Sequence, residues 1–282
     1  MLSLALGIVA ALSWGVHDVC VRFATARAGV TLALLTVLGT GVLAIMPFAM
    51  LWGDWTVVTA RTLTAAIASG TVYAGGGYSP YRAFAIGPVR LVAPVIGAYP
   101  ILSVLWAAAQ GQTPAAGQAL AVLAIVTGVA LTAVMAEHDA KAGTGNFRTA
   151  LLWSLAGSLG FALTFALGQM ASEGGAGLPA VLISRFAAFL SLLAATLGLG
   201  GRPKPAAAPW GLLMIMGCCD ALALGLVIAA GDLPRPEFAA VAASTFGMVT
   251  VLLAWVFLKE RITARQWGAV ALVFAGIGYL AW

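Results

Sequence analysis

The chain has 282 residues, of which 62% are hydrophobic and only 8% carry a charge, and its mean hydropathy is +1.04. This composition excludes an ordinary soluble globular protein, in which roughly a quarter of the residues are charged. The formal net charge of +5 comes from basic residues scattered singly along the chain, which is not the clustered pattern of a nucleic-acid-binding surface. Cys20, Cys218 and Cys219 all lie in apolar stretches, so we expect neither disulfides nor a CxxC metal site.

Apolar runs of about twenty residues, each long enough to cross roughly 30 Å of hydrocarbon, follow one another along the chain. Gly/Pro-rich or polar residues separate them. The ten predicted spans cover residues 2–22, 29–52, 62–86, 88–110, 116–135, 148–170, 178–200, 208–230, 236–258 and 264–282. The first run has no basic segment before it, so we expect a membrane span rather than a cleaved signal peptide. The sequence therefore predicts an all-α, multi-pass membrane protein.

The chain also resembles itself. A shift of 148 positions aligns several identical residues, namely Pro88 with Pro236, Leu105 with Leu253, Gln118 with Gln266, Ala121 with Ala269, Val122 with Val270, Gly128 with Gly276 and Ala133 with Ala281. The longest polar stretch lies at the centre, so we predict a first repeat at 1–137, a linker at 138–147 and a second repeat at 148–282. Five spans per repeat is an odd number, which requires the repeats to have inverted topology around a central cavity.

The basic residues of the short loops predict an orientation. One face receives Arg27, Arg90, Lys141, Arg148, Arg202, Lys204, Lys259, Arg261 and Arg265. The other face, which carries both termini, receives only Arg61 and Arg235. Because cytoplasmic loops are enriched in basic residues, this pattern predicts a cytoplasmic first face and external termini. A missed or split helix would reverse this assignment.

Several segments carry a resemblance to a known family. The segment Phe257–Thr263 (FLKERIT), with Gln266–Ala269 (QWGA) and Phe274–Gly278 (FAGIG), is similar to the repeat of the EamA-type branch of the drug/metabolite transporter superfamily. The first half carries a degraded copy, with Gln112-Thr113 where Glu260-Arg261 stand. The segment Tyr81–Pro88 resembles the junction between the third and fourth helices of that repeat. Members with ten helices usually have cytoplasmic termini, which is opposite to the prediction from charge.

The resemblance implies ten helices around a cavity lined mainly by helices 1, 3, 4, 6, 8 and 9. It also implies a secondary carrier of small polar metabolites in the bacterial inner (cytoplasmic) membrane, without a catalytic residue, metal or cofactor. Amino-acid export of the YddG kind, with a neutral or aromatic substrate, is the central expectation. Its partners would be the substrate and membrane lipid, not nucleic acid, and two halves in one chain favour a monomer. The alternatives are an exporter of cationic drugs or other metabolites, a membrane-embedded enzyme and a channel.

Ionisable residues within spans are costly and are therefore candidates for function. The first span holds Trp14, His17, Asp18 and Arg22. Asp18 and Arg22 are four residues apart and can neutralise each other, which would be a purely structural role. His17 shares a helix face with Trp14, and the ordinary pKa of histidine, about 6.5, suits a proton carrier. The alternative is a histidine whose ring hydrogen-bonds a neighbouring carbonyl group.

The third span contains Gly75–Gly77 followed by Pro80, a pattern that bends or weakens a helix. Bent membrane helices can expose backbone groups to a cavity, although small residues also permit close helix packing. Tyr78 and Tyr81 are three residues apart at this bend, and Tyr99 lies between Pro94 and Pro100. These three tyrosines are the first choice for substrate contacts, because their rings are apolar and carry a hydroxyl group.

In the second half, Asp220 lies deep in an apolar run and must be protonated, paired or hydrated. Arg185 is a possible ion-pair partner, and the alternative is a site for a substrate amine or a coupling proton. Ser244, Thr245 and Phe246 align with the region of Gly97 and Ala98, whereas Phe161 and Thr164 align with the region 16–19 when Gly160 is placed on Gly15. The predicted substrate-binding set is Tyr78, Tyr81, Tyr99, Trp14, His17, Asp220, Phe246, Ser244 and Phe161. The candidates for proton coupling are His17, Asp18 and Asp220.

No catalytic motif appears in the sequence. It contains no P-loop, HExxH, GxSxG or potassium-filter sequence, so ATP hydrolysis and the common hydrolase mechanisms are not indicated.

Overall fold

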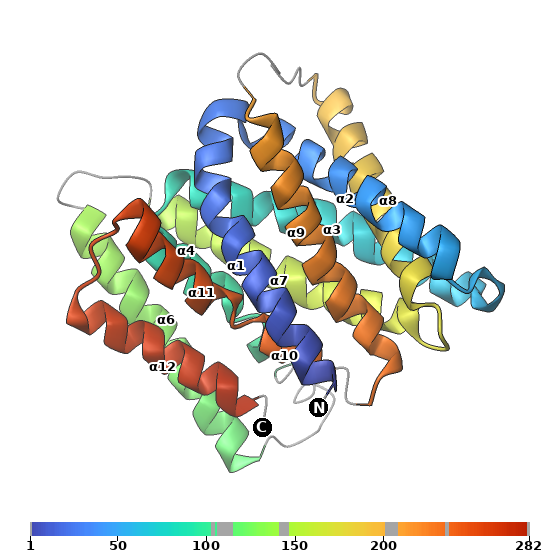
Figure 1. The fold of residues 1–282 in the computed structure, drawn as a ribbon. Helices are drawn as coiled ribbons and strands as arrows, with labels where there is room; N and C mark the ends of the chain where they lie inside the picture. Colours follow the sequence, from blue (N-terminus) through green and yellow to red (C-terminus); the bar gives the residue numbers. More distant parts are fainter. Residues whose placement is uncertain are drawn as a thin grey trace.

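A computed structural model describes residues 2–102, 105, 115–140, 147–200, 208–234 and 237–280, and every regular element within these ranges is helical. Among these residues, six helices are long and apolar enough to cross a membrane. They are α1 (Leu2–Ala28), α2 (Val30–Trp52), α7 (Phe147–Ser172), α8 (Gly177–Gly198), α9 (Trp210–Ala229) and the segment Phe238–Leu258. The chain is therefore an integral, multi-pass membrane protein. Figure 1 shows the start of α1 and the end of the chain at the same end of the bundle.

Helix α3 (Ala60–Ile86) and the pair of helices α6 (Ala116–Ala140) and α12 (Ala264–Leu280) add to this bundle. Helix α3 is as long as α1 but less apolar, because it contains tyrosines, arginines and several glycines. Helices α6 and α12 pack against each other along one edge (Figure 1). Short η1 (Trp55–Val57) and η3 (Ala230–Asp232) turns occupy connections between long helices. Where the structure describes them, the predicted spans fall on helices with different boundaries, and residues 103, 104 and 106–110 of the fourth span lie outside the described residues.

The largest boundary difference is at the end of the first span, which was predicted to end at residue 22. Helix α1 continues to Ala28 and is followed by Gly29, whose φ of 73° lies in the left-handed region that glycine adopts without strain. Arg22 does not end the helix, because its side chain leaves the bundle interior and donates a hydrogen bond to the Gly87 carbonyl oxygen at 2.9 Å. A basic residue near a helix C-terminus is electrostatically favourable, so this extension is physically reasonable.

The fourth and ninth predicted spans are interrupted rather than continuous. Helix α4 (Val89–Gly97) ends at a turn over residues 98–99. Helix α10 (Glu237–Ala243) ends at a turn over residues 244–245, after which α11 (Phe246–Leu253) and the π-helical η4 (Ala254–Leu258) continue. Pro100 lacks a backbone donor, which explains the first break. At the second, the Ser244 and Thr245 hydroxyls hydrogen-bond carbonyls of the preceding turn.

The two interruptions touch. A Cβ atom on Gly97 would lie 2.8 Å from the Ser244 carbonyl oxygen, and one on Gly247 would lie 2.7 Å from the Ala93 carbonyl oxygen. Any larger side chain at these two positions would therefore separate the backbones. Non-helical backbone within a membrane is tolerated where other protein segments surround it, and here each break is covered by the other.

The long helices cross at small residues. Helix α3 packs on α7 and α1 packs on α9, whereas α2 packs on α8 and α9. At the crossing of α3 and α7 a Cβ atom on Gly160 would lie 2.4 Å from the Gly76 Cα. This approach brings two backbones into contact, which is how membrane helices gain packing energy without a hydrophobic driving force.

Contacts between the two halves are reciprocal. A Cβ atom on Gly128 would lie 2.9 Å from the Ala269 carbonyl oxygen, and one on Gly276 would lie 2.9 Å from the Ala121 carbonyl oxygen. Both pairs of positions differ by the same shift of 148. In the same way, Gly70 lies against the Ser184 carbonyl and Gly217 lies against the Val37 carbonyl, with a shift of 147. Each contact is thus repeated with the halves exchanged.

Candidate functional site

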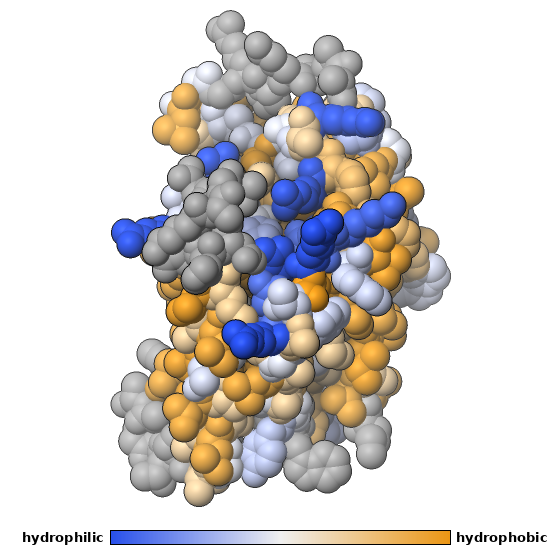
Figure 2. All heavy atoms as spheres, turned by 90° about the vertical axis from the view of Figure 1, so that its left-hand side faces the viewer, coloured by the Kyte–Doolittle hydropathy of each residue, from blue (hydrophilic) through white to orange (hydrophobic). Residues whose placement is uncertain are grey.

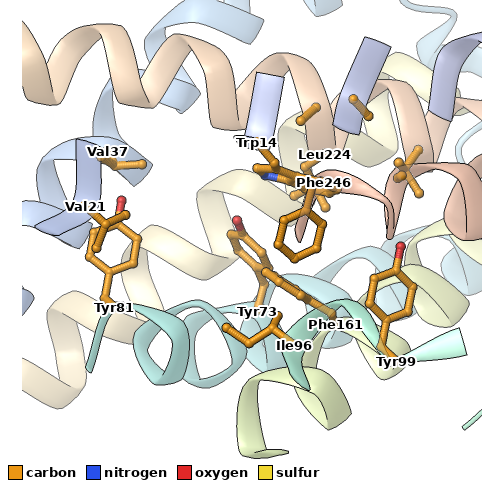
Figure 3. Close-up of a cluster of buried hydrophobic side chains, with 14 of the residues drawn as sticks. Trp14, Val21, Val37, Tyr73, Tyr81, Ile96, Tyr99, Phe161, Leu224 and Phe246 are labelled. Carbon is orange, nitrogen blue, oxygen red and sulfur yellow. The ribbon is translucent and has the colours of Figure 1, made fainter. Parts of the chain in front are cut away.

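The centre of the bundle holds a cluster of aromatic side chains from both halves. The rings of Trp14 on α1 and Phe161 on α7 are stacked with centroids 5.8 Å apart. Tyr73, Phe165 and Phe246 each lie within 6.0 Å of one of these two rings, measured between centroids. Figure 3 shows Trp14, Tyr73, Phe161 and Phe246 in the middle of the cluster, with Tyr81 and Tyr99 at its opposite ends. The cluster forms because small residues at the helix crossings leave only these large side chains to fill the interior.

The aromatic contacts follow the same reciprocity as the backbone contacts. Trp14 meets Phe246 edge-on with centroids 6.0 Å apart, and Phe161 meets Tyr99 edge-on at 6.2 Å. Trp14 and Phe161 are 147 positions apart, as are Tyr99 and Phe246. These contacts favour a shift of 147 between α1 and α7, whereas the sequence comparison had placed Gly160 on Gly15.

Asp220 is the centre of a first polar network. Its carboxylate accepts hydrogen bonds from the Trp14 indole at 2.9 Å and from the Tyr73 hydroxyl at 2.5 Å. The Arg185 guanidinium donates to the second carboxylate oxygen and also to the Asp220 main-chain carbonyl. Arg185 and Asp220 are 0% and 1% exposed, so the two charges are removed from water together. Of the two alternatives that the sequence left open for Asp220, the ion pair with Arg185 is present, and it neutralises the aspartate.

The Arg185 guanidinium retains N–H donors that Asp220 does not use. The guanidinium carbon lies 5.3 Å from the centroid of the Tyr73 ring, a cation–π arrangement. Both terminal nitrogens are bound to Asp220, while Nε is buried and has no hydrogen-bond partner among the described residues. A buried donor without a partner is costly, which makes it a candidate for contact with a bound molecule.

Asp18 is the centre of a second polar network. The Nδ1 atom of His17 lies 2.9 Å from an Asp18 carboxylate oxygen, and Nε2 lies 2.8 Å from the Tyr81 hydroxyl. The Thr250 hydroxyl of α11 lies 3.4 Å from the other Asp18 oxygen and 2.9 Å from the Phe246 carbonyl oxygen of its own helix, so its single proton serves one of these two acceptors at a time. A neutral imidazole protonated on Nδ1 donates to Asp18 and accepts from Tyr81. His17 therefore bonds a carboxylate and a phenol, in place of the carbonyl group considered from sequence.

The predicted pairing of Asp18 with Arg22 is wrong. Arg22 lies 3.8 Å from Glu260 and donates to the Gly87 carbonyl, whereas Asp18 points into the bundle. The competing partners of each side chain explain this difference, since Gly87 and Glu260 hold Arg22 while His17 lies beside Asp18. Among the described residues Asp18 has no permanently charged partner such as Arg185, although it interacts electrostatically with Asp220 and with His17. Two carboxylates thus share one guanidinium and one titratable imidazole.

The three tyrosines singled out from sequence do not form one site. Tyr81 bonds His17, and Tyr99 donates to the Ala240 carbonyl across the helix break. Tyr78 lies apart, against Trp153 with ring centroids 5.9 Å apart. The sequence analysis missed Tyr73, which binds Asp220 directly, and Thr250, which binds Asp18. A shift of 147 would have pointed to Tyr73, because it aligns this residue with Asp220.

The remaining candidates of the second half divide into two groups. Phe161 and Phe246 belong to the aromatic cluster, as expected. Ser244 and Thr245 stabilise the helix break through bonds to their own segment. Thr164 is fully buried, and its carbonyl accepts a hydrogen bond from Ser69 at 2.8 Å. These residues surround the centre but are uncharged. The charged groups of the centre belong to the two carboxylate networks.

A cavity of about 970 Å³ lies beside the polar centre, between the α1–α2 turn and helices α3, α7 and α8. Tyr78 and Trp153 form part of its wall, together with hydroxyl groups such as those of Thr71 and Ser79. Trp14, Tyr73 and Asp220 are not among its lining residues. Of the candidate tyrosines, Tyr78 alone borders this cavity. The lining residues of the cavity include no member of the two carboxylate networks.

Comparison with known proteins places this geometry in context. The model of the EamA-like transporter family matches residues 148–282. A solved structure described only as a crystal structure of a protein is similar over 99% of this chain and 96% of its own, with a TM-score of 0.66 and 16% sequence identity. That similarity concerns the fold alone. A search of curated proteins finds no match. Residues 148–282 of this multi-pass membrane protein are therefore similar to the domain of the EamA-like transporter family.

Proposed function

We propose that the protein is a secondary transporter that exports neutral or aromatic amino acids across the bacterial inner membrane by alternating access. Its halves, 1–137 and 148–282, would be inverted five-helix repeats that tilt around the central aromatic cluster. The reciprocal contacts of Gly128 and Gly276 support this arrangement, because an internal two-fold relation repeats every contact with the halves exchanged. The meeting of two interrupted helices at the centre also supports it, since broken helices commonly form transporter binding sites.

The observation that carries the substrate class is the unequal pairing of the two buried carboxylates. Asp220 is neutralised by Arg185, but the side-chain partners of Asp18 among the described residues are His17 and the Thr250 hydroxyl. A buried carboxylate without a fixed cation requires a proton or a positive ligand. A substrate ammonium group at Asp18 would meet this requirement. The surrounding rings of Trp14 and Phe246 would accommodate an apolar side chain.

Arg185 would complete recognition of an amino acid. A zwitterion needs a cationic partner for its carboxylate, and the buried Nε donor of Arg185 has none among the described residues. Charge-assisted hydrogen bonds of guanidinium groups to carboxylates are among the stronger interactions in proteins. In this proposal the substrate lies between Asp18 and Arg185, with Tyr73 and Tyr81 beside it.

Proton coupling would use the same centre. When no substrate is bound, a proton on His17 or Asp18 balances the charge, and arrival of the ammonium group releases it. The transporter would then exchange one proton for one substrate. Asp220 would hold Arg185 in place and would not itself carry the proton, because its carboxylate already accepts from Arg185, Tyr73 and Trp14.

A second candidate function is export of cationic drugs. The Asp18 carboxylate, which faces His17 rather than a guanidinium group, favours this function as much as amino-acid export, since a drug cation would satisfy the carboxylate equally well. The distinction lies in Arg185, whose positive charge is useful only to a substrate that carries a carboxylate. A primary amine and the corresponding amino acid should therefore differ in how strongly they compete with a labelled substrate for transport.

Counterflow in proteoliposomes tests the proposal. Unlabelled neutral or aromatic amino acid is placed inside, and a trace of labelled amino acid outside. We expect transient accumulation with the wild type and none with Asp18→Asn. Asp54→Asn is the matched control, because Asp54 is exposed and caps the short η1 turn. Accumulation of an amine without a carboxylate, but of no amino acid, would favour export of cationic drugs over export of amino acids. Unchanged exchange by Asp18→Asn would exclude both.

A further inference from the structure

Glu260 joins the second half of the chain to a helix of the first half. This residue lies in the connection between η4 and α12, and its carboxylate faces the N-terminus of α4. One carboxylate oxygen lies 3.0 Å from the Val89 amide and the other lies 3.3 Å from the Arg90 amide. The first amides of a helix have no partner within it and carry partial positive charge, so a carboxylate here is stabilising.

The backbone before Glu260 is shaped for this contact. Helix α11 continues as the π-helical η4, and Lys259 adopts a left-handed conformation with φ of 53°. Both features are unfavourable for ordinary residues and tend to occur at functional sites. Together they turn the chain by the end of α11 and place Glu260 against α4.

Arg22 closes the arrangement from α1. It lies 3.8 Å from a Glu260 oxygen and hydrogen-bonds the Gly87 carbonyl just before α4. The side chain of Glu260 is only 12% exposed, whereas that of Arg22 is 43% exposed. The carboxylate is thus shielded enough for its charge to matter, while the arginine remains at the rim. We call Arg22, Glu260 and the α4 N-terminus the charged latch.

The latch lies on the face that carries most basic residues. Figure 2, which faces the left side of Figure 1, shows hydrophilic side chains gathered in the middle of this end of the molecule. Helices α4 and α11 pack together here, with Gly247 against the Ala93 carbonyl. The latch therefore reinforces an existing contact between the two halves of the chain.

The corresponding residues of the other half are neutral. A shift of 147 positions aligns Arg22 with Gln169, whose amide donates to the Val227 carbonyl at 3.3 Å. A shift of 148 aligns Glu260 with Gln112, which lies outside the described residues. An inverted repeat would thus carry charged contacts at one face and amides at the other. Ion–dipole contacts are stronger than those of neutral groups.

We infer that the charged latch holds the basic face closed and biases the resting transporter toward opening at the opposite face. The inference rests on the proposed alternating access, but it concerns the resting conformation rather than the substrate. Weakening the latch should increase the fraction of molecules that are open at the basic face. A substrate approaching from that face would then bind with higher apparent affinity, because a larger fraction is competent to bind.

Labelling of one cysteine tests the inference. Cys20, Cys218 and Cys219 are replaced by serine, and Ala93→Cys is introduced, since Ala93 is fully buried in the contact between α4 and α11. The measured quantity is its rate of reaction with a maleimide in membranes. We expect Glu260→Gln to raise this rate about three- to tenfold and Arg22→Gln to raise it less, as for loss of an ion at a helix terminus. Glu173→Gln is the matched control, because Glu173 pairs with Arg61 at 3.4 Å but both side chains are more than half exposed.

An unchanged labelling rate in folded Glu260→Gln protein would overturn the inference and leave Glu260 as a helix cap only. If Glu260→Gln does not fold, Arg22→Gln decides, because it leaves the cap in place. An unchanged labelling rate in the Arg22→Gln variant would also overturn the inference. The assay needs no substrate, so a failed counterflow experiment together with increased labelling would refute the proposed substrate and retain the latch.

Discussion

Helices α1 and α7 occupy corresponding places in the bundle but carry different chemistry. Trp14 of α1 stacks on Phe161 of α7, its counterpart at a shift of 147. The next positions on the same face are His17 and Asp18 in α1, but Thr164 and Phe165 in α7. A similar difference separates Leu38 of α2 from its counterpart Arg185 of α8, and both are fully buried. The packing is therefore repeated while the charges are not.

This comparison teaches that packing and recognition are under different constraints. Small residues at helix crossings must recur, because each half has to close against the other in the same way. A binding site between the halves receives one set of polar groups from each, so the two sets can diverge. The following predictions disturb charge, packing, proton carriage and a single hydrogen bond in turn.

The largest effect is expected when the buried charge of Arg185 loses its partner. Asp220→Asn would leave Arg185 buried without its partner, which typically costs about 3–5 kcal/mol. We expect a large loss of thermal stability, measured for purified protein in detergent. Combining it with Arg185→Leu, the residue found at the corresponding position of α2, should restore most of the loss. A stable Asp220→Asn single variant would show that the ion pair is not needed for folding.

One helix crossing, at Gly160, should tolerate a larger side chain less well than its counterpart position in α1. Gly160→Val would drive a side chain into the backbone at Gly76, and overpacking commonly costs about 1–3 kcal/mol. The corresponding α1 position is Ser13, which is only partly buried and bonds its own helix at Val9. Ser13→Val is therefore the control, and melting temperatures of the two variants are compared. Equal losses would mean that the two crossings are equally tight.

Substitution of His17 should impair proton coupling but leave substrate exchange intact. His17→Gln keeps a polar side chain beside Asp18 and Tyr81 but cannot carry a positive charge. We expect counterflow to persist, while uptake driven by a pH gradient falls at least about tenfold, as expected when a titratable carrier is removed. The measurement is labelled-substrate uptake with and without an imposed gradient. Gradient-driven uptake at the wild-type rate would assign the proton to another group.

The smallest effect is expected at Thr250, which supplies the contact of the second half with Asp18. Thr250→Val removes a hydrogen bond worth about 0.5–1.5 kcal/mol, so the half-saturating substrate concentration should change about two- to tenfold. Thr196→Val is the control, because that buried hydroxyl bonds only the Leu192 carbonyl of its own helix. Equal transport by both variants would remove Thr250 from the site.

Much of the architecture was open to prediction because apolar composition and helix length are local properties. The helical class and the repeated membrane spans followed from the sequence, and the pairing of Arg185 with Asp220 was one of the two alternatives that it offered. The interruptions in α4 and before α11 did not, although Pro100 gave a signal for the first. Both breaks are supported by contact with each other, and a pattern within one segment contains no such information.

The candidate site was predicted less completely. His17, Asp18 and Asp220 were found because charge within an apolar run is visible in any sequence. Tyr73 was missed because tyrosine is common in buried helices, and its role depends on a carboxylate 147 residues away. Spacing alone made Arg22 a possible partner of Asp18, but contacts with Glu260 and the Gly87 carbonyl hold it elsewhere.

The sequence by itself determined that this chain spans a membrane repeatedly, that its halves resemble each other and that a few charged residues must lie inside. Hydrophobicity and repeat spacing are sufficient for these conclusions. Tertiary structure decided which charges neutralise each other, leaving Asp18 without the guanidinium partner that Asp220 has. It also decided which helices touch and where Glu260 reaches α4. The physical reason is that charge pairing and backbone contact depend on distance in space, and helices distant in sequence fix those distances only when they pack.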